Sequence, residues 1–150
     1  MSEGEKVYLE DLSVGQRFES APVELTAEAI KAFAAQFDPQ PFHLDEGAAE
    51  GSFFRGLAAS GWHVAGLTMR MLVDGTLPIA SGLIGAEVEV AWPRPTRPGD
   101  VLRAVVTIEA IHPSRSKPDR GFVTVRTETL NQNDEPAQVM TSKMLVLRRP

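Results

Sequence analysis

The 150-residue sequence contains no cysteine, which excludes disulfides, thiolate metal sites and cysteine nucleophiles. It has no basic run and a formal net charge of −5, so double-stranded nucleic acid is not an expected partner. No apolar run is as long as a membrane span, and the polar N-terminus (residues 1–6) does not resemble a secretory signal. We therefore expect a cytoplasmic protein that has no contact with a membrane.

What is present is typical of one globular domain over residues 1–150, with 43% hydrophobic and 23% charged residues. The charge is distributed unevenly. Residues 1–50 hold three Lys/Arg against eleven Asp/Glu, whereas residues 51–150 hold twelve against nine. A local basic patch in the second part could therefore meet a small phosphorylated ligand.

Apolar residues at three- and four-residue spacing predict a helix from Ala27 to about Phe37, with Thr26 as its N-cap and Asp38-Pro39 as its end. A short helix is expected from Asp45 to about Glu50. A longer candidate over residues 60–73 is apolar around most of its circumference, which is typical of a buried helix.

After residue 75 the period of the apolar pattern becomes two, which indicates strands. We expect strands at residues 87–92, 102–109, 122–130 and 137–148, with a turn at 131–136 and a short additional strand at 16–19. Helices followed by long strands favour an α+β domain in which an antiparallel sheet wraps around one buried central helix.

The stretch from Asp38 to His43, DPQPFH, carries an acid and an imidazole held by two prolines. Because proline fixes its own φ and restricts the preceding residue, this segment is stiff enough to aim two titratable groups at one point. Proton-transfer chemistry needs that arrangement. Taken singly, Asp38 could be a turn residue before proline and His43 a surface histidine, but the pair at this spacing favours a functional site.

Several segments together resemble the MaoC-like hydratases and dehydratases of the hotdog fold. Residues 37–45 read FDPQPFHLD, residues 59–63 read ASGWH, the N-terminal residues 8–18 read YLEDLSVGQRF, and residues 95–100 read PTRPGD before a strand. The family motif has the form (Gly/Phe)-Asp-x-(Asn/Gln/His)-Pro-(hydrophobic)-His-x-Asp, followed by a His-Gly or Ser-Gly segment. The resemblance thus spans nearly the whole chain.

This resemblance implies a homodimer, or a higher homo-oligomer, with active sites at or near the subunit interface. It implies addition of water to a trans-2-enoyl thioester of coenzyme A, or its removal from a 3-hydroxyacyl thioester. Asp38 and His43 correspond to the catalytic pair, and the Gly61 N–H corresponds to the donor to the thioester oxygen. Ser60 and Gln40, where many relatives have His and Asn, are expected to contact the substrate together with Trp62.

Each expected role has a physical basis. Asp38 follows a helix C-terminus, where the dipole disfavours a carboxylate, so we expect it to be more basic than usual. Gly61 begins the central helix, where its N–H is free and the absence of a side chain allows a ligand carbonyl to approach. Ser60 is a candidate cap of this helix.

The remaining candidates are weaker. Arg115 and Lys117 lie in the basic segment 114–120, which is either a solvated hairpin tip or a contact for coenzyme A phosphates. Arg94 and Arg97 are further candidates for that contact. We interpret Asp45 as a helix cap, His63 as a packed residue and His112 as a loop residue. No residues show metal-ligand spacing, so we expect no metal and no cofactor apart from the coenzyme A of the substrate.

The sequence therefore predicts an enoyl-CoA hydratase or 3-hydroxyacyl-CoA dehydratase. Two alternatives are a hotdog acyl-CoA thioesterase, which also uses a carboxylate near a helix N-terminus, and a non-catalytic subunit that binds acyl thioesters. The Asp38–His43 spacing argues against both.

Overall fold

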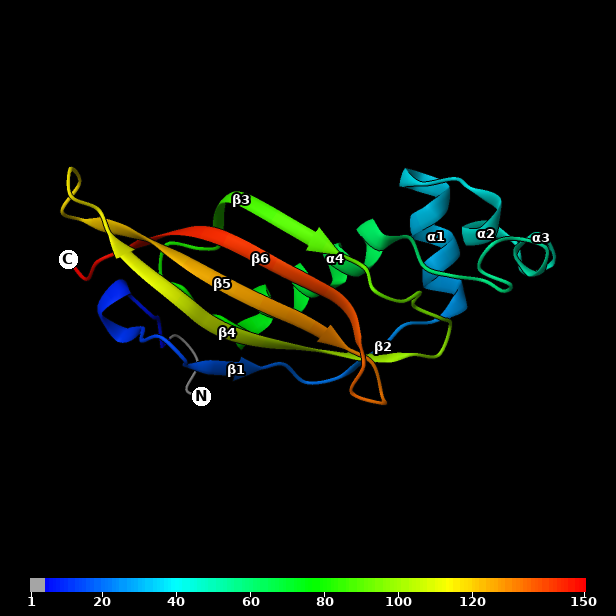
Figure 1. Cartoon of the computed structure of the whole chain (residues 1–150), viewed down its shortest axis with the longest axis horizontal. Helices are drawn as coiled ribbons and strands as arrows, with labels where there is room; N and C mark the ends of the chain where they lie inside the picture. Colours follow the sequence, from blue (N-terminus) through cyan, green and yellow to red (C-terminus); the bar gives the residue numbers. More distant parts are fainter. Residues whose placement is uncertain (1–4) are drawn as a thin grey trace.

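The computed structural model describes residues 5–150 (Figure 1). Residues 1–4, part of the polar N-terminus interpreted above, lie outside the described residues. The helices are α1 (Ala27–Phe37), α2 (Pro41–Leu44), α3 (Glu46–Glu50) and α4 (Gly61–Met71), with a 3-10 turn at Leu9–Asp11 and a π-helical turn at Leu72–Thr76. The strands are β1 (Arg17–Glu19), β2 (Val23–Glu24), β3 (Ile84–Ala91), β4 (Val101–Pro113), β5 (Arg120–Leu130) and β6 (Pro136–Leu147).

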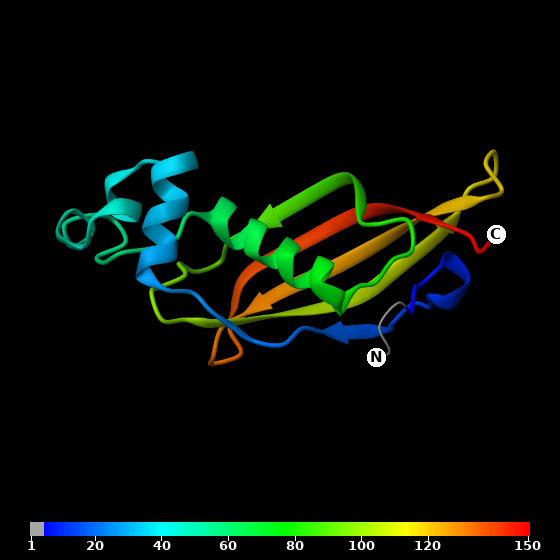
Figure 2. The same ribbon diagram turned by 180° about the vertical axis from the view of Figure 1, so that it is seen from behind.

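All six strands form one antiparallel sheet in the order β1-β4-β5-β6-β3, with β2 also paired to β4. Residues 131–135 connect β5 to β6 at the position of the predicted turn, and the Asn131 side-chain oxygen accepts hydrogen bonds there from the N–H groups of Asn133 and Glu135. The sheet curves around α4, which runs along its concave side (Figure 2). The predicted α+β hotdog architecture is confirmed.

The core lies between α4 and the inward-facing side chains of the sheet. On β5, residues 121, 123, 125, 127 and 129 are buried in strict alternation, which is the two-residue period expected of a sheet with one covered face. The buried face of α4 consists of Val64, Thr68 and Met71. These side chains hold the helix in the curve of the sheet.

The prediction that α4 is buried on all sides is wrong for the single chain. Trp62, Met69 and Val73 are 63%, 40% and 61% exposed. The sheet covers only one side of the helix, so the opposite apolar side has no cover within this chain.

A second apolar cluster lies at one end of the molecule, where α1, α2 and α3 pack beside the start of α4 (Figure 1). Ile30 of α1, Ala49 of α3 and Val64 of α4 meet there with Leu102 of β4. The predicted α1 and α3 are confirmed, including Thr26, whose hydroxyl accepts from the Ala29 N–H, and Asp45, which accepts from Gly47.

Helix α2 is a correction to the expected stiff turn, because the second proline begins a helix. Pro41 stands at the first helical position, where its missing N–H costs nothing and its fixed φ suits the helix. His43 therefore projects from a short helix. Within residues 5–150, none of the helices combines the length and the apolar character needed to span a membrane.

Candidate active site

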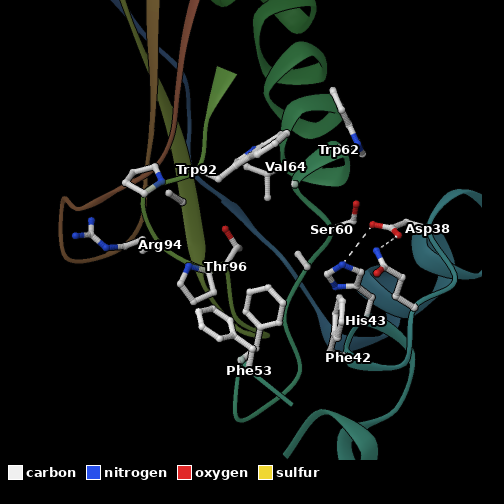
Figure 3. Close-up of a pocket in the computed structure, with 17 residues that line it drawn as sticks. Asp38, Phe42, His43, Phe53, Ser60, Trp62, Val64, Trp92, Arg94 and Thr96 are labelled. Carbon is white, nitrogen blue, oxygen red and sulfur yellow. Dashed lines mark hydrogen bonds and ion pairs between the residues drawn. The ribbon is translucent and has the colours of Figure 1, made fainter. Parts of the chain in front are cut away.

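A pocket of about 570 Å³ opens where α2, the start of α4 and the segment after β3 meet (Figure 3). The predicted Asp38, His43, Gly61, Ser60, Gln40 and Trp62 all line it. Its remaining walls are largely apolar or aromatic, with one cation: Phe42, Phe53, Phe54, Ala59, Val64, Trp92, Pro93, Arg94, Pro95, Thr96 and Ala137. Six residues spread over 25 positions of the sequence are thus brought to one cavity.

Asp38 caps the C-terminus of α1, where its N–H donates to the Ala34 carbonyl over 2.9 Å. Its carboxylate makes two contacts inside the pocket. The Gln40 side-chain amide donates to Oδ1 over 2.6 Å, and Oδ2 lies 3.3 Å from Nε2 of His43. Gln40 therefore acts on the Asp38 carboxylate in this structure, and its expected contact with the substrate stays a prediction.

His43 is held from behind by the backbone of the segment that leads into α4. Its Nδ1 lies 2.6 Å from the Ala58 carbonyl oxygen, and the imidazole is only 5% exposed. A carbonyl oxygen can only accept, so Nδ1 carries a hydrogen and Nε2 is the atom turned toward Asp38. Phe42 and Phe54 pack against the ring, at centroid distances of 4.6 and 6.1 Å.

The pKa of Asp38 is lowered, which corrects the expectation of a more basic carboxylate. Burial is the largest influence and acts to raise the pKa, but the Gln40 hydrogen bond, the Ser60 hydroxyl and the charge of His43 together outweigh it. The Ser60 hydroxyl makes no hydrogen bond of good geometry, yet it lies beside the carboxylate and favours its charged form (Figure 3). Asp38 is therefore ionised at neutral pH.

The predicted cap at Ser60 is wrong, because its side chain makes no capping hydrogen bond to α4. The residue is fully buried at the N-cap position, and its hydroxyl has no hydrogen-bond partner among the described residues. Ser60 instead lies beside the Asp38 carboxylate on the same side of the pocket (Figure 3). A polar group this deeply buried is available to a ligand that can pair with it.

Gly61 begins the 11-residue helix α4, and no hydrogen bond of its N–H is found within the described part of the chain. The reason for glycine differs from the expectation. A Cβ atom at this position would lie 2.6 Å from Cε2 of Trp92, so the indole, rather than a ligand, fills the space beside the α-carbon. The free N–H remains on the pocket wall at the positive end of the helix dipole.

Arg115 and Lys117 are not brought to this pocket within the chain. Both are exposed at the tip of the β4–β5 hairpin, at the opposite end of the sheet (Figure 1). Arg97 is also occupied, because its guanidinium donates to the carbonyls of Phe54, Gly56 and Leu57. Arg94 lines the pocket but donates to the Pro136 carbonyl and lies 3.9 Å from the Glu135 carboxylate.

The other two histidines make no contact with the Asp38–His43 pair within the described residues. His63 stacks on Phe33 at 4.7 Å, and burial lowers its pKa. His112 is exposed near the end of β4, which extends further than predicted. Among residues 5–150, no group of three or more His, Asp or Glu side chains could hold a metal ion.

Several residues of the site were not predicted. Trp92, Phe53 and Phe54 form walls of the pocket, and the Ala58 carbonyl fixes the imidazole. The one sequence signal was the tryptophan at residue 92, which stands directly before Pro93 at the end of a predicted strand. Backbone carbonyls such as that of Ala58 carry no signal in the sequence.

Comparison with known proteins agrees with this geometry. A MaoC-like dehydratase from Rhodospirillum rubrum of known crystal structure is 59% identical, with a TM-score of 0.94 and coverage of 96% of this chain and 99% of that one. An (R)-hydratase from A. caviae involved in PHA biosynthesis is 26% identical, with a TM-score of 0.69 and coverage of 94% and 99%.

An (R)-specific enoyl-CoA hydratase from R. rubrum is 28% identical over 120 residues, which are 80% of this chain and 78% of that protein. The model of the MaoC like domain matches residues 11–133. That match covers most of the chain, including the Asp38–His43 pair and the start of α4. The chain therefore belongs to the MaoC-like domain family, whose hotdog fold it shares.

Proposed function

We propose that this protein is a hydratase/dehydratase that adds water to a trans-2-enoyl thioester of coenzyme A, or removes it from the 3-hydroxyacyl thioester. The observation that carries the proposal is the placement of His43 Nε2 3.3 Å from Asp38 Oδ2, in the pocket that Gly61 also lines. The hydratases among its relatives support it.

The hydrogen on Nδ1 of His43 determines what the pair can do. When His43 is protonated, Nε2 donates to the Asp38 carboxylate over 3.3 Å; when the imidazole is neutral, Nε2 and the carboxylate are both acceptors, and a molecule that donates to each can join them. Water has two donors and meets that requirement. We therefore assign the pair to holding the water that becomes the hydroxyl group of the product.

In the hydration direction, the oxygen of this water bonds to the β-carbon and one of its protons passes to the pair. The pair returns a proton to the α-carbon, so it ends in its starting state of protonation. Negative charge develops on the thioester oxygen in between, and the Gly61 N–H is the donor that stabilises it. A donor of this kind is worth about 3 kcal/mol, and each acid–base group roughly 10²–10⁴-fold in rate.

The test is hydration of a panel of enoyl-CoA thioesters by the wild type and by the Asp38→Asn and His43→Ala variants. We expect each variant to lose roughly 10²-fold or more in kcat/KM. Asp45→Asn is a matched control, because this nearby exposed carboxylate only caps α3. Hydration that is absent from the wild type, or that survives both substitutions, would contradict the proposal, and cleavage of the thioester would favour the thioesterase.

We also propose that the protein assembles as a homodimer through β3 and the uncovered side of α4. β3 is an edge strand with exposed Ile84 (46%) and Val88 (51%), and α4 carries the exposed Trp62 and Met69. Trp62 at the start of α4 contacts Trp92, the residue directly after β3, edge-on at 5.3 Å between centroids. An unpaired apolar edge of this kind is a template for pairing with a second chain.

Light scattering after size exclusion tests this assembly. We expect a dimer for the wild type and a monomer for Val88→Lys, which places a charge on the edge. Val14→Lys is the control, because Val14 is equally apolar and 67% exposed but precedes β1, near the opposite edge of the sheet. A monomeric wild type, or a Val88→Lys variant that remains dimeric, would argue against this interface.

A further inference from the structure

A chain of buried hydrogen bonds crosses the layer between α4 and the sheet directly beside the pocket. Trp92 Nε1 donates to Gln138 Oε1 over 2.9 Å, and Gln138 Nε2 donates to Thr68 Oγ1 over 3.2 Å. Thr68 Oγ1 also lies 2.6 Å from Thr129 Oγ1. Three of these residues are 0% exposed: Gln138, Thr68 and Thr129. Water cannot reach their polar atoms, so each side chain depends on the others for its hydrogen bonds.

Trp92 stands where this polar chain meets the pocket. Its indole reaches from the end of β3 toward the first turn of α4, beside Val64 (Figure 3), and packs on the α-carbon of Gly61. A Cβ at Gly61 would lie only 2.6–2.8 Å from three atoms of the indole. The ring is thus fixed at its edge by Gln138 and on its face by the helix.

The pocket ends at this ring. Val64 and Ala137 line it, whereas Thr68, one turn further along α4, and Gln138, the next residue on β6, are not among its lining residues. A cavity that continued between α4 and the sheet would have to pass the position of Gln138. The hydrogen-bonded side chains occupy that space instead.

We propose that Trp92, held in place by Gln138, is a specificity-determining residue that restricts the acyl group to short chains. This inference deepens the proposed function and rests on it. A longer acyl chain would have to push the indole off Gly61, or press methylene groups against the Gln138 amide and leave buried polar atoms without partners. Both arrangements oppose the gain from burying the added methylenes.

Binding of saturated acyl-CoA thioesters, measured by calorimetry, tests the inference without any turnover. In an open apolar pocket, each added methylene raises affinity roughly fourfold. We expect the wild type to show no such gain from butyryl-CoA to octanoyl-CoA. If the affinity of the wild type rises roughly fourfold with each methylene, the proposal is overturned. This measurement uses the wild-type protein alone and does not depend on the folding of any variant.

Variants at the tryptophan provide the second arm. Trp92→Ala should raise the affinity for octanoyl-CoA relative to butyryl-CoA roughly tenfold or more, because it removes the wall. Trp92→Phe, which retains a ring, should keep the ratio nearer to that of the wild type. Tyr8→Leu removes an aromatic ring at the opposite end of the sheet and should leave the ratio unchanged. An unchanged ratio in a folded Trp92→Ala variant would overturn the assignment.

The two proposals fail in different ways. Hydration of long and short enoyl-CoA thioesters at equal kcat/KM would overturn the chain-length limit and leave the hydratase activity standing. If the protein binds short acyl-CoA thioesters preferentially but hydrates no enoyl-CoA, the proposed reaction is overturned. The role of Trp92 in limiting chain length would then still stand. An absence of binding to every acyl-CoA thioester would overturn both.

Discussion

His43 presents Nε2 to Asp38, at 3.3 Å from Oδ2, because its other ring nitrogen is engaged by a backbone carbonyl. The relationship fixes which atom of the imidazole can take part in proton transfer. It depends on the segment that precedes α4 as much as on the two residues themselves.

Gln40→Leu should raise the pKa of Asp38, because it removes the amide hydrogen bond to the carboxylate. The lowered pKa contributes stability that is fully present above the pKa of the unfolded chain, about 4, and is lost as the pH falls through the lower folded-state value. We expect the variant to lose about 1 kcal/mol in free energy of unfolding at neutral pH, and less in acid. Urea denaturation at several pH values measures the difference.

Gln36→Leu is the control for this experiment, because Gln36 is an exposed glutamine of α1 outside the pocket. It should leave the pH dependence of unfolding as in the wild type. An equal loss at neutral and acid pH in the Gln40 variant would show that the amide does not act through the charge of Asp38.

Gly61→Ala should destabilise the protein by roughly 1–3 kcal/mol, since the new methyl group would meet the Trp92 indole at 2.6 Å. Gly47→Ala, in helix α3, would place its methyl group 3.6 Å from Asp45 Oδ1, an ordinary contact, and should instead stabilise by about 0.5–1 kcal/mol. Thermal unfolding of the two variants checks the opposite signs. Two shifts in the same direction would contradict the packing of Trp92 on Gly61.

Arg97→Lys should lower kcat roughly tenfold, because lysine cannot reproduce the hydrogen bonds of the guanidinium to the carbonyls of Phe54, Gly56 and Leu57. Those carbonyls precede Ala58, whose own carbonyl orients His43. Arg103→Lys is the control, since Arg103 pairs with an exposed carboxylate, Asp134. Steady-state kinetics of both variants measure the change in kcat. Equal kcat values of the two variants would refute a positioning role for Arg97.

Thr68→Val should cost about 1–3 kcal/mol in free energy of unfolding, because it removes a hydrogen-bond partner from the buried Gln138 and Thr129 side chains. Thr129→Val should be destabilising as well, and the double variant should cost less than the two single changes together. Guanidinium denaturation of all four proteins gives the coupling. Simple additivity would mean that the two hydroxyls do not interact.

The sequence was sufficient for the elements that depend on local pattern. The alternation in β5, the Thr26 cap and the Asp45 cap were all predicted, because periodicity and capping act between residues a few positions apart. The pairing of Asp38 with His43 was predictable for the same reason, since only five positions separate them. The short helix α2 was missed, because Pro41 suits both a turn and a first helical turn.

The tertiary structure decided what depends on residues far apart in the chain. Desolvation and the side chains of Gln40, Ser60 and His43 set the pKa of Asp38, and the helix dipole alone gave the wrong sign. Trp92, 31 positions after Gly61, leaves no room for a side chain at that residue. The hydrogen bond to Gln138 holds the indole in that place. Sequence pattern determined which groups are available to the site. Packing determined the direction of the Asp38 pKa shift, the Gly61 N–H left unpaired within the described residues and the shape of the pocket, because these depend on distances that only the folded chain sets.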